Sequence, residues 1–285
     1  MSQVLVNGIV ASCTIALVAL GFGLLYRIIR FFDFSYGIIY TLAAYTTFGL
    51  AHYLKAPLGL ALVLGVAFAS VLACSLELFI YRPLRGRNAS ASVMLLASLG
   101  VYIVLQNMIS LCFGNDTKVL RSGSVNVGIG FCGARITEVQ VALICATAIL
   151  FIVLLALLNM TKIGKAMRAV AVDSDLAAIS GVPVNGTILC TFVLASVLAG
   201  ICAVLVSMDT DLTPLMGMRM FMYAAVAAIA GGIESPGGIA IGALLLGMAQ
   251  HFGIWVIGSQ WQDAIAFLIL IGCLIIRPKR FVCRG

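Results

Sequence analysis

Long apolar segments alternate with short polar clusters along almost the whole chain of 285 residues. A helix needs about 20 predominantly apolar residues to cross the roughly 30 Å hydrocarbon layer of a bilayer. Hydropathy predicts nine candidate spans, at residues 4–26, 36–53, 58–81, 91–113, 139–159, 185–207, 219–233, 238–257 and 262–276. The second and seventh segments are short for this thickness, which favours broken or re-entrant helices at these two places.

Composition places the chain in one structural class. Hydrophobic residues make up 63% of the sequence and charged residues 9%, whereas a soluble domain has about 25% charged residues. The apolar segments lack the alternation of barrel strands, and only helices or closed barrels satisfy the backbone polar groups in lipid. We therefore expect an all-α integral membrane protein, a single domain over residues 1–285, built as a polytopic bundle of about 8 to 10 transmembrane helices.

The basic residues predict the orientation of the chain in the membrane. With alternating spans, twelve of the 17 Lys and Arg residues fall on one side, and the other five share the opposite side with several aspartates. The positive-inside rule makes the richer side cytoplasmic, with the N-terminus outside and the C-terminus inside. The twelve are Arg27, Arg30, Arg82, Arg85, Arg87, Lys162, Lys165, Arg168, Arg277, Lys279, Arg280 and Arg284. This topology accounts for the net charge of +7, so no nucleic-acid partner is required.

The nine cysteines and two histidines form no pattern that indicates catalysis or metal binding. Six of the cysteines lie within predicted spans, where a thiol behaves as a small apolar side chain. The sequence has no CxxC pair and no Cys/His cluster, so we expect no metal site, no cofactor and no catalytic residue. Cys112 and Cys132 lie near the same external loop, and whether they pair is left open.

Polar residues between the first two segments are candidates for the transport pathway. Asp33, Ser35, Tyr36 and Gly37 stand where two apolar runs meet, and glycine allows irregular backbone there. Asp33 is interpreted either as the cap of the second helix or as a pathway residue, and the two roles are compatible.

Three further polar residues lie within predicted spans. We interpret Glu77 as an interfacial charge that pairs with Arg82 or Arg85, in preference to a substrate contact. Gln106 and Asn107 place two amides in an apolar helix. Hydrogen bonds from these amides to neighbouring helices are favoured over substrate recognition.

A glycine-rich turn separates the seventh and eighth segments. Gly231 and Gly232, followed by Pro236 and Gly237, force a tight and irregular connection. Backbone of this kind is buried against protein rather than exposed to lipid. We therefore expect these four residues to have a structural role.

Residues 161–184, with the sequence TKIGKAMRAVAVDSDLAAISGVPV, form a polar, helix-forming interruption. A short helix is predicted over 165–172, and a second helix, capped within Asp173-Ser174-Asp175, is predicted to end at Gly181. On a helical projection, small and apolar side chains share a face that can dock into a groove, namely Met167, Val170, Ala171, Ser174, Ala177 and Ala178. The alternative is an interfacial helix on anionic lipid, which three basic residues accompanied by two aspartates favour less.

Several motifs along the chain share their order with one family. They are LGFGLLYRI in the first segment, DFSYG at 33–37, YRPLR at 81–85, SLGVYIVLQN at 98–107, GKAMRA at 164–169 with Gly181, TPLMG at 213–217, GGIESPGG at 231–238 and Arg277-Pro278. Over nearly its full length, the chain resembles the membrane permease subunits of the branched-chain amino-acid type of ABC importer, the hydrophobic amino-acid uptake class. Each motif is weak alone, and the collinear order makes the match specific.

The resemblance implies a multi-pass protein of the bacterial inner membrane with several partners. These are two cytoplasmic ABC ATPase subunits, an external or periplasmic substrate-binding protein, and a second permease subunit, usually in a heterodimer although a homodimer is possible. It also implies that the segment at 161–184 is the coupling element that docks on the ATPase, with Gly164, Lys165, Arg168, Ala169, Ala177 and Gly181. The chain has no G-x-x-x-x-G-K-[ST] phosphate loop, so ATP hydrolysis is expected in another polypeptide.

Some positions depart from the family pattern and leave the substrate open. The family commonly has N-F-A-H-G where this chain has DFSYG, an arginine at the position of Leu78, and a glycine at the position of Glu234. Branched-chain amino acids are the default substrate, and urea, short amides or another small organic solute are alternatives. A stand-alone secondary transporter is a further alternative, which calls for acids near the membrane midplane and an inverted repeat.

Overall fold

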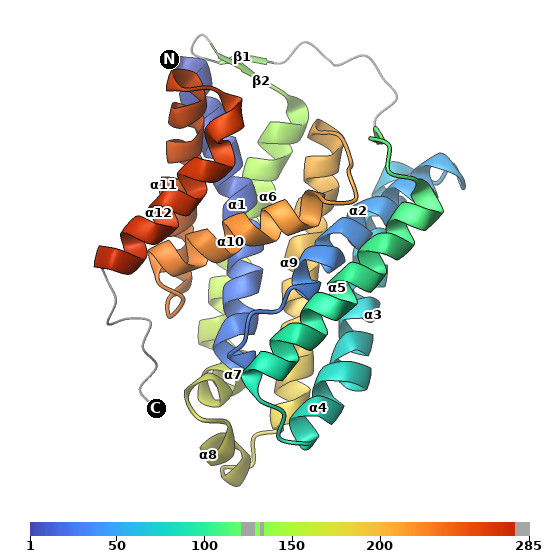
Figure 1. Ribbon diagram of the computed structural model, residues 1–285, viewed down its shortest axis with the longest axis vertical. Helices are drawn as coiled ribbons and strands as arrows, with labels where there is room; N and C mark the ends of the chain where they lie inside the picture. Colours follow the sequence, from blue (N-terminus) through green and yellow to red (C-terminus); the bar gives the residue numbers. More distant parts are fainter. Residues whose placement is uncertain (121–128, 132–133, 277–285) are drawn as a thin grey trace.

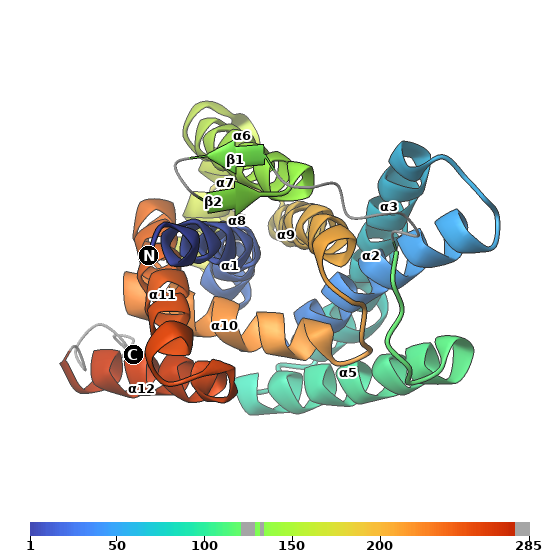
Figure 2. The same cartoon turned by 90° about the horizontal axis from the view of Figure 1, so that it is seen from above.

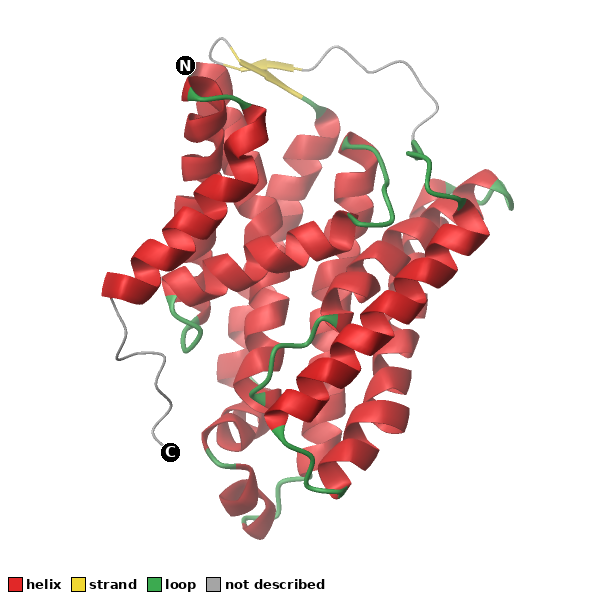
Figure 3. Ribbon diagram, in the orientation of Figure 1, coloured by secondary structure: helices red, strands yellow, loops and turns green. Residues whose placement is uncertain are grey.

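The computed structural model describes residues 1–120, 129–131 and 134–276. Helices dominate the fold (Figure 3). In chain order they are α1 (Ser2–Ile29), α2 (Ser35–His52), α3 (Leu58–Leu76), the π-helix η1 (Glu77–Tyr81), α4 (Arg82–Gly86), α5 (Ala91–Phe113), α6 (Glu138–Met160), α7 (Lys162–Val172), α8 (Ser174–Ile179), α9 (Val184–Asp209), α10 (Met216–Gly231), α11 (Pro236–Val256), the 3₁₀-helix η2 (Ser259–Trp261) and α12 (Gln262–Ile276). The strands β1 (Ile129–Phe131) and β2 (Ala134–Ile136) pair antiparallel, with Gly130 opposite Arg135.

Each of the nine predicted apolar segments coincides with a helix. In the described part of the chain, six helical segments are long and apolar enough to cross a membrane: α1, the continuous helix at 58–86, α5, α6, α9 and α11. Helices α2, α10 and α12 have 18, 16 and 15 residues and fall short of that standard. The second and seventh segments were predicted to be short, whereas the ninth was not. The all-α polytopic membrane fold is confirmed.

Helix α1 occupies the centre of the bundle because small residues let its neighbours approach closely. It packs against α6, α9, α10 and α11, which surround it in Figure 2. A side chain added at Gly21 would meet the Tyr36 hydroxyl of α2 and the Ala195 carbonyl of α9. A side chain added at Gly23 would meet Ile239 of α11. In lipid, where burying apolar surface gives little drive for association, such close packing holds helices together.

Helices α2, α3 and α5 extend the bundle to one side of this centre (Figure 2). Helix α2 packs against α3, α5, α9 and α10, so it joins the two parts of the molecule. Helix α5 rests on α2 and leaves apolar side chains such as Leu96 and Leu111 exposed. These surfaces are suited to contact with lipid or with another membrane subunit.

The two ends of the molecule differ in their basic residues. The described basic residues that were assigned to the cytoplasm lie at the end that holds α4, α7 and the C-terminus of α1 (Figure 1). The opposite end holds the N-terminus and β2, where Gln3 Nε2 donates to the Arg135 carbonyl at 3.1 Å. This separation is the one that the predicted orientation requires. The basic cluster at 277–284 and Cys132 lie outside the described residues.

Candidate functional site

Residues 161–184 contain a helical hairpin made by α7 and α8 (Figure 1). The Thr161 Oγ1 atom accepts a hydrogen bond from the Gly164 amide at 3.0 Å, which starts α7 at Lys162. The helix therefore begins three residues earlier than predicted, because the threonine caps it. A side chain added at Gly164 would collide with the backbone of Leu158, so this glycine lets α7 cross the end of α6 closely.

A capping residue starts the second helix of the hairpin, and a glycine follows its end. The Asp173 Oδ1 atom accepts hydrogen bonds from the amides of Asp175 and Leu176 at 2.8 and 3.0 Å, so the predicted cap is confirmed. Helix α8 ends at Ile179, two residues before the predicted end at Gly181. Gly181 has a φ of 83°, a left-handed conformation that glycine adopts without strain, and the chain reverses there.

Three of the six residues on the small and apolar face predicted to dock on a partner are turned toward the molecule itself. Met167, Val170 and Ala177 are buried, because α7 packs on α6, α9 and α1 and α8 packs on α9. These side chains hold the hairpin on the bundle and are not free to enter a groove in another protein. Ser174 and Ala178 of the same predicted face are exposed, so docking of this face on a partner stays a prediction.

A different group of apolar side chains on the hairpin is exposed. Ile163, Val172, Leu176 and Ile179 have exposed fractions of 48, 77, 63 and 84%, and we call them the exposed apolar set. Lys165, Arg168 and Ala169 are exposed as well. The Arg168 guanidinium donates to the Asn159 Oδ1 atom at 2.9 Å, which ties α7 to the end of α6.

Asp33 is buried at the junction of α1 and α2. Its Oδ1 atom accepts hydrogen bonds from the Ser35 amide at 2.9 Å, the Ser35 hydroxyl at 2.6 Å and the Tyr81 hydroxyl at 2.7 Å. The bond to the amide satisfies a free donor in the first turn of α2, but the N-cap residue is Phe34, so Asp33 supports the helix start from one residue before the cap. Its other oxygen, Oδ2, has no hydrogen-bond partner among the described residues. Sequence reasoning did not place Tyr81 here, because 48 residues separate it from Asp33.

Tyr36 and Gly37 hold helices together at the start of α2. The Tyr36 hydroxyl is buried and donates to the Val18 carbonyl of α1 at 3.1 Å. A side chain added at Gly37 would lie 3.1 Å from the Gly217 carbonyl of α10. The Gly217 amide donates to the Thr41 hydroxyl at 3.1 Å, so α2 and α10 meet backbone to backbone.

The three polar residues predicted within other spans differ in their surroundings. Glu77, in the π-helix η1, is buried and forms an ion pair with Arg85, whose side chain is 26% exposed. The predicted pairing of Glu77 is confirmed. Gln106 is half-buried and Asn107 is exposed on α5. Asn107 donates to the Ile103 carbonyl of its own helix at 2.7 Å, and its predicted bond to a neighbouring helix stays a prediction.

The glycine-rich turn joins α10 to α11 as a tight connection, as predicted. Gly231 is the last residue of α10, Gly232 has a φ of 94°, and Pro236 is the first residue of α11. A side chain added at Gly231 would collide with the Gly238 carbonyl, because the two helices cross there in close contact. One added at Gly237 would meet nothing within 4 Å.

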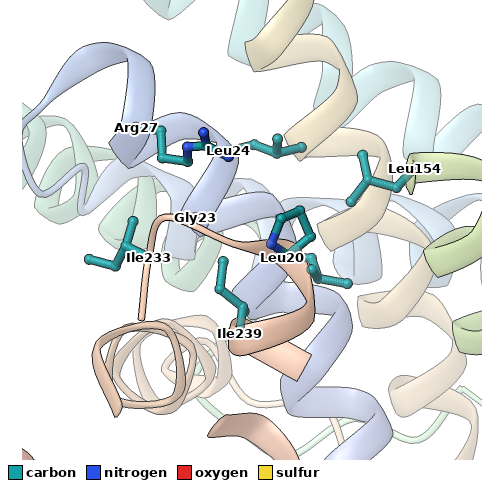
Figure 4. Close-up of a pocket in the computed structure, with 8 residues that line it drawn as sticks. Leu20, Gly23, Leu24, Arg27, Leu154, Ile233 and Ile239 are labelled. Atoms are coloured by element: carbon teal, nitrogen blue, oxygen red, sulfur yellow. The ribbon is translucent and has the colours of Figure 1, made fainter. Parts of the chain in front are cut away.

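A small apolar pocket lies at the C-terminal end of α1 beside this turn (Figure 4). The residues around it come from α1, α6, the turn before α11 and the start of α11: Leu20, Gly23, Leu24, Arg27, Leu154, Ile233, Pro236 and Ile239. Arg27 also borders a second small pocket with Met167 and Arg168 of α7. The sequence analysis used Arg27 only as one of the charges that predict the orientation in the membrane. In the structure, it lies where α1, α6, α7 and the glycine-rich turn meet.

The described side chains gather for packing and hydrogen bonding rather than for metal chemistry. Among the described residues, no group of three or more His, Cys, Asp or Glu side chains is placed to hold a metal ion. The arrangement is suited to fixing helices against one another and to passing on movements of the hairpin.

Comparison with known proteins identifies the family. The family model described as the permease component of branched-chain amino acid transport systems matches residues 4–274. BraD of Pseudomonas aeruginosa, named a high-affinity branched-chain amino acid transport system permease protein, is 34% identical over 99% of this chain and 95% of its own length. LivH of Escherichia coli K12, with a name of the same kind, is 29% identical over 99% of this chain and 95% of its own length.

A solved structure agrees in fold. PsaBC from Streptococcus pneumoniae, solved in complex with a Fab, matches 97% of this chain and 92% of its own chain with a TM-score of 0.54 and 15% identity. At this identity the likeness concerns the fold alone. The six apolar helices and the bacterial relatives make the protein a multi-pass inner-membrane protein. The chain belongs to the family of branched-chain amino acid transport system permease components.

Proposed function

We propose that this chain is the permease subunit of an ATP-driven importer of branched-chain amino acids. The observation that carries the proposal is the family match over residues 4–274, together with relatives named for this transport along nearly their whole length. Asp33 and Tyr36, which depart from the family pattern, are buried and bonded to Ser35 and Val18. Their surroundings support a change in helix packing rather than a change of substrate.

Energy enters through the hairpin, which docks on a cytoplasmic ABC ATPase subunit. Met167, Val170 and Ala177 attach the hairpin to the bundle, and the exposed apolar set lies beside Lys165 and Arg168. Apolar side chains rimmed by polar ones are typical of a protein contact surface. Gly164 and Gly181 shape the hairpin, the first through its close approach to α6 and the second through its left-handed backbone.

A second permease subunit completes the transport pathway, and an external substrate-binding protein delivers the amino acid. In the described part of this chain, Asp33 and Ser35 bond to each other and to Tyr81, so their oxygens are largely engaged within one subunit. Gln106 and Asn107 lie on α5, a helix at the surface of the bundle, and are candidates for a pathway between two subunits. A sister permease in a heterodimer is the favoured partner, and a second copy of this chain is the alternative.

The test is uptake by the purified complex. The chain would be purified with the proteins that accompany it, reconstituted into vesicles, and supplied with ATP and labelled leucine, isoleucine, valine or urea. We expect ATP-dependent accumulation of the three amino acids, and loss of uptake when the ATPase is omitted. Uptake of urea without leucine would contradict the substrate, and uptake by the chain alone on a proton gradient would contradict the ATP-driven mechanism.

A further inference from the structure

Arg30 connects the end of the central helix α1 to the hairpin. Its Nη2 atom donates to the Val172 carbonyl at 2.7 Å and to the Ala171 carbonyl at 3.2 Å. These two residues end α7, where carbonyls have no partner within the helix and where a positive charge is favoured by the helix dipole. One guanidinium therefore caps the hairpin helix from a different element of the fold.

The backbone at Arg30 is in a conformation that disfavours any side chain. Its φ of 54° and ψ of 26° are left-handed, and its amide donates to the Tyr26 carbonyl at 2.9 Å as α1 ends. Glycine occupies this region without strain, whereas residues with a Cβ atom are uncommon in it. An arginine here is strained relative to glycine. Its guanidinium, however, reaches the last turn of α7.

The residues immediately after this arginine are fixed to other elements. The Phe31 ring lies 5.5 Å from the Tyr81 ring of η1. The Phe32 carbonyl accepts a hydrogen bond from the Ser98 hydroxyl of α5 at 3.4 Å. Asp33 accepts one from the Tyr81 hydroxyl at 2.7 Å. These contacts connect the end of α1 to the start of α2, to η1 and to α5.

We propose that Arg30 is a positioning residue that links movement of the hairpin to the α1–α2 junction. When the ATPase displaces α7, the guanidinium carries the displacement to residues 31–36 and through them to α2 and α5. The source of the movement rests on the proposed function, whereas the link itself is a property of this chain. If Arg30 were only a local cap for α7, its loss would affect α7 and leave the junction unchanged.

Hydrogen exchange of the purified chain in lipid nanodiscs tests the link without any transport. Arg30→Ala removes the guanidinium and retains the Cβ atom, so the strain of the left-handed backbone is the same as with arginine. Arg87→Ala is the matched control, because Arg87 is exposed and its side chain has no hydrogen bond or ion pair in the described part of the chain. We expect Arg30→Ala to speed exchange about tenfold both at 169–173 and at 31–36, and Arg87→Ala to change neither. Faster exchange at 169–173 alone would overturn the proposal.

Transport coupling gives an independent readout in the reconstituted complex. We expect Arg30→Ala to lower the number of molecules taken up per ATP hydrolysed several-fold at an unchanged amount of folded complex. Arg30→Lys should rescue part of the loss, since an ammonium can still donate to one carbonyl. Arg30→Gly should lose coupling as Arg30→Ala does, although glycine relaxes the backbone.

A normal uptake ratio in Arg30→Gly would show that backbone shape and not the guanidinium matters, and would overturn the proposal. Failure of the unmodified complex to take up any branched-chain amino acid would contradict the proposed function instead. The exchange experiment would still decide the role of Arg30 in that case.

Discussion

Helices α1 and α5 are both apolar enough to span a membrane, yet they have opposite surroundings. Their most apolar windows of 18 residues have mean hydropathies of 2.3 and 1.8, but 83% of the α1 window is buried in the molecule and only 17% of the α5 window. Hydropathy therefore identifies both as spans and does not distinguish the centre of the bundle from its surface. The difference lies in the small residues that allow close approach.

Glycines show this difference residue by residue. Gly21 of α1 lies against α2 and α9, and Gly217 of α10 lies against the Gly37 carbonyl of α2. Gly100 of α5 has nothing within 4 Å of the position where a Cβ atom would be. The same residue type is thus required where backbones touch and dispensable where the helix faces outward. Substitutions at such matched positions test whether close packing distinguishes the two kinds of helix.

The largest effect is expected at the contact of α2 and α10. Gly217→Val would force side-chain atoms into the Gly37 carbonyl and the Thr41 hydroxyl, and should lower the free energy of unfolding by about 3 kcal/mol. Gly100→Val, the control on α5, should change the free energy of unfolding by less than about 0.5 kcal/mol. Thermal unfolding of both variants in the same detergent checks the difference, and equal melting temperatures would refute the packing described for α10.

A smaller effect is expected within the glycine-rich turn. Gly231→Ala adds a methyl group against the Gly238 carbonyl and should cost about 2 kcal/mol of stability. Gly237→Ala places its methyl group in open space and should be neutral within about 0.5 kcal/mol. The measurement is the same unfolding experiment, and a loss of stability in Gly237→Ala equal to that in Gly231→Ala would show that the crossing of α10 and α11 is misplaced.

The smallest of these effects concerns a hydroxyl group. Tyr81→Phe removes the donor to Asp33 and should lower the free energy of unfolding by about 1.5 kcal/mol. Tyr53→Phe removes a hydroxyl from a side chain that is 67% exposed and should have no measurable effect. If the two variants unfold at the same temperature, the bond from Tyr81 to Asp33 contributes nothing to stability.

Local sequence signals predicted the helices and their caps well. Apolar runs predicted every span-like helix, and Asp173 and the glycine-rich turn were placed correctly because caps and turns depend on a few adjacent residues. In the described part of the chain, α10 and α12 are shorter than the six long apolar helices, whereas α2, with 18 residues, is less apolar than they are. Polar interruptions and length, rather than hydropathy alone, decide which apolar helices can cross the bilayer.

Contacts between distant residues could not be predicted in the same way. Nothing near Asp33 in the sequence points to Tyr81, and nothing near Arg30 points to the end of α7. The burial of Met167, Val170 and Ala177 could not be predicted, because a helical projection contains no information about α6 and α9. Pairings of this kind depend on how the helices assemble, which only the folded chain shows.

The central claim is that the exposed apolar set of the hairpin is the contact for the ATPase, and one pair of variants tests it most directly. Leu176→Glu changes a member of that set that is 63% exposed, and Leu54→Glu changes a leucine that is 71% exposed just after α2, away from the hairpin. In complexes purified through the permease, we expect Leu176→Glu to retain about tenfold less ATPase at an unchanged melting temperature of the permease. Leu54→Glu should retain all of it. Full retention of the ATPase and normal ATP-driven uptake in Leu176→Glu would contradict the account.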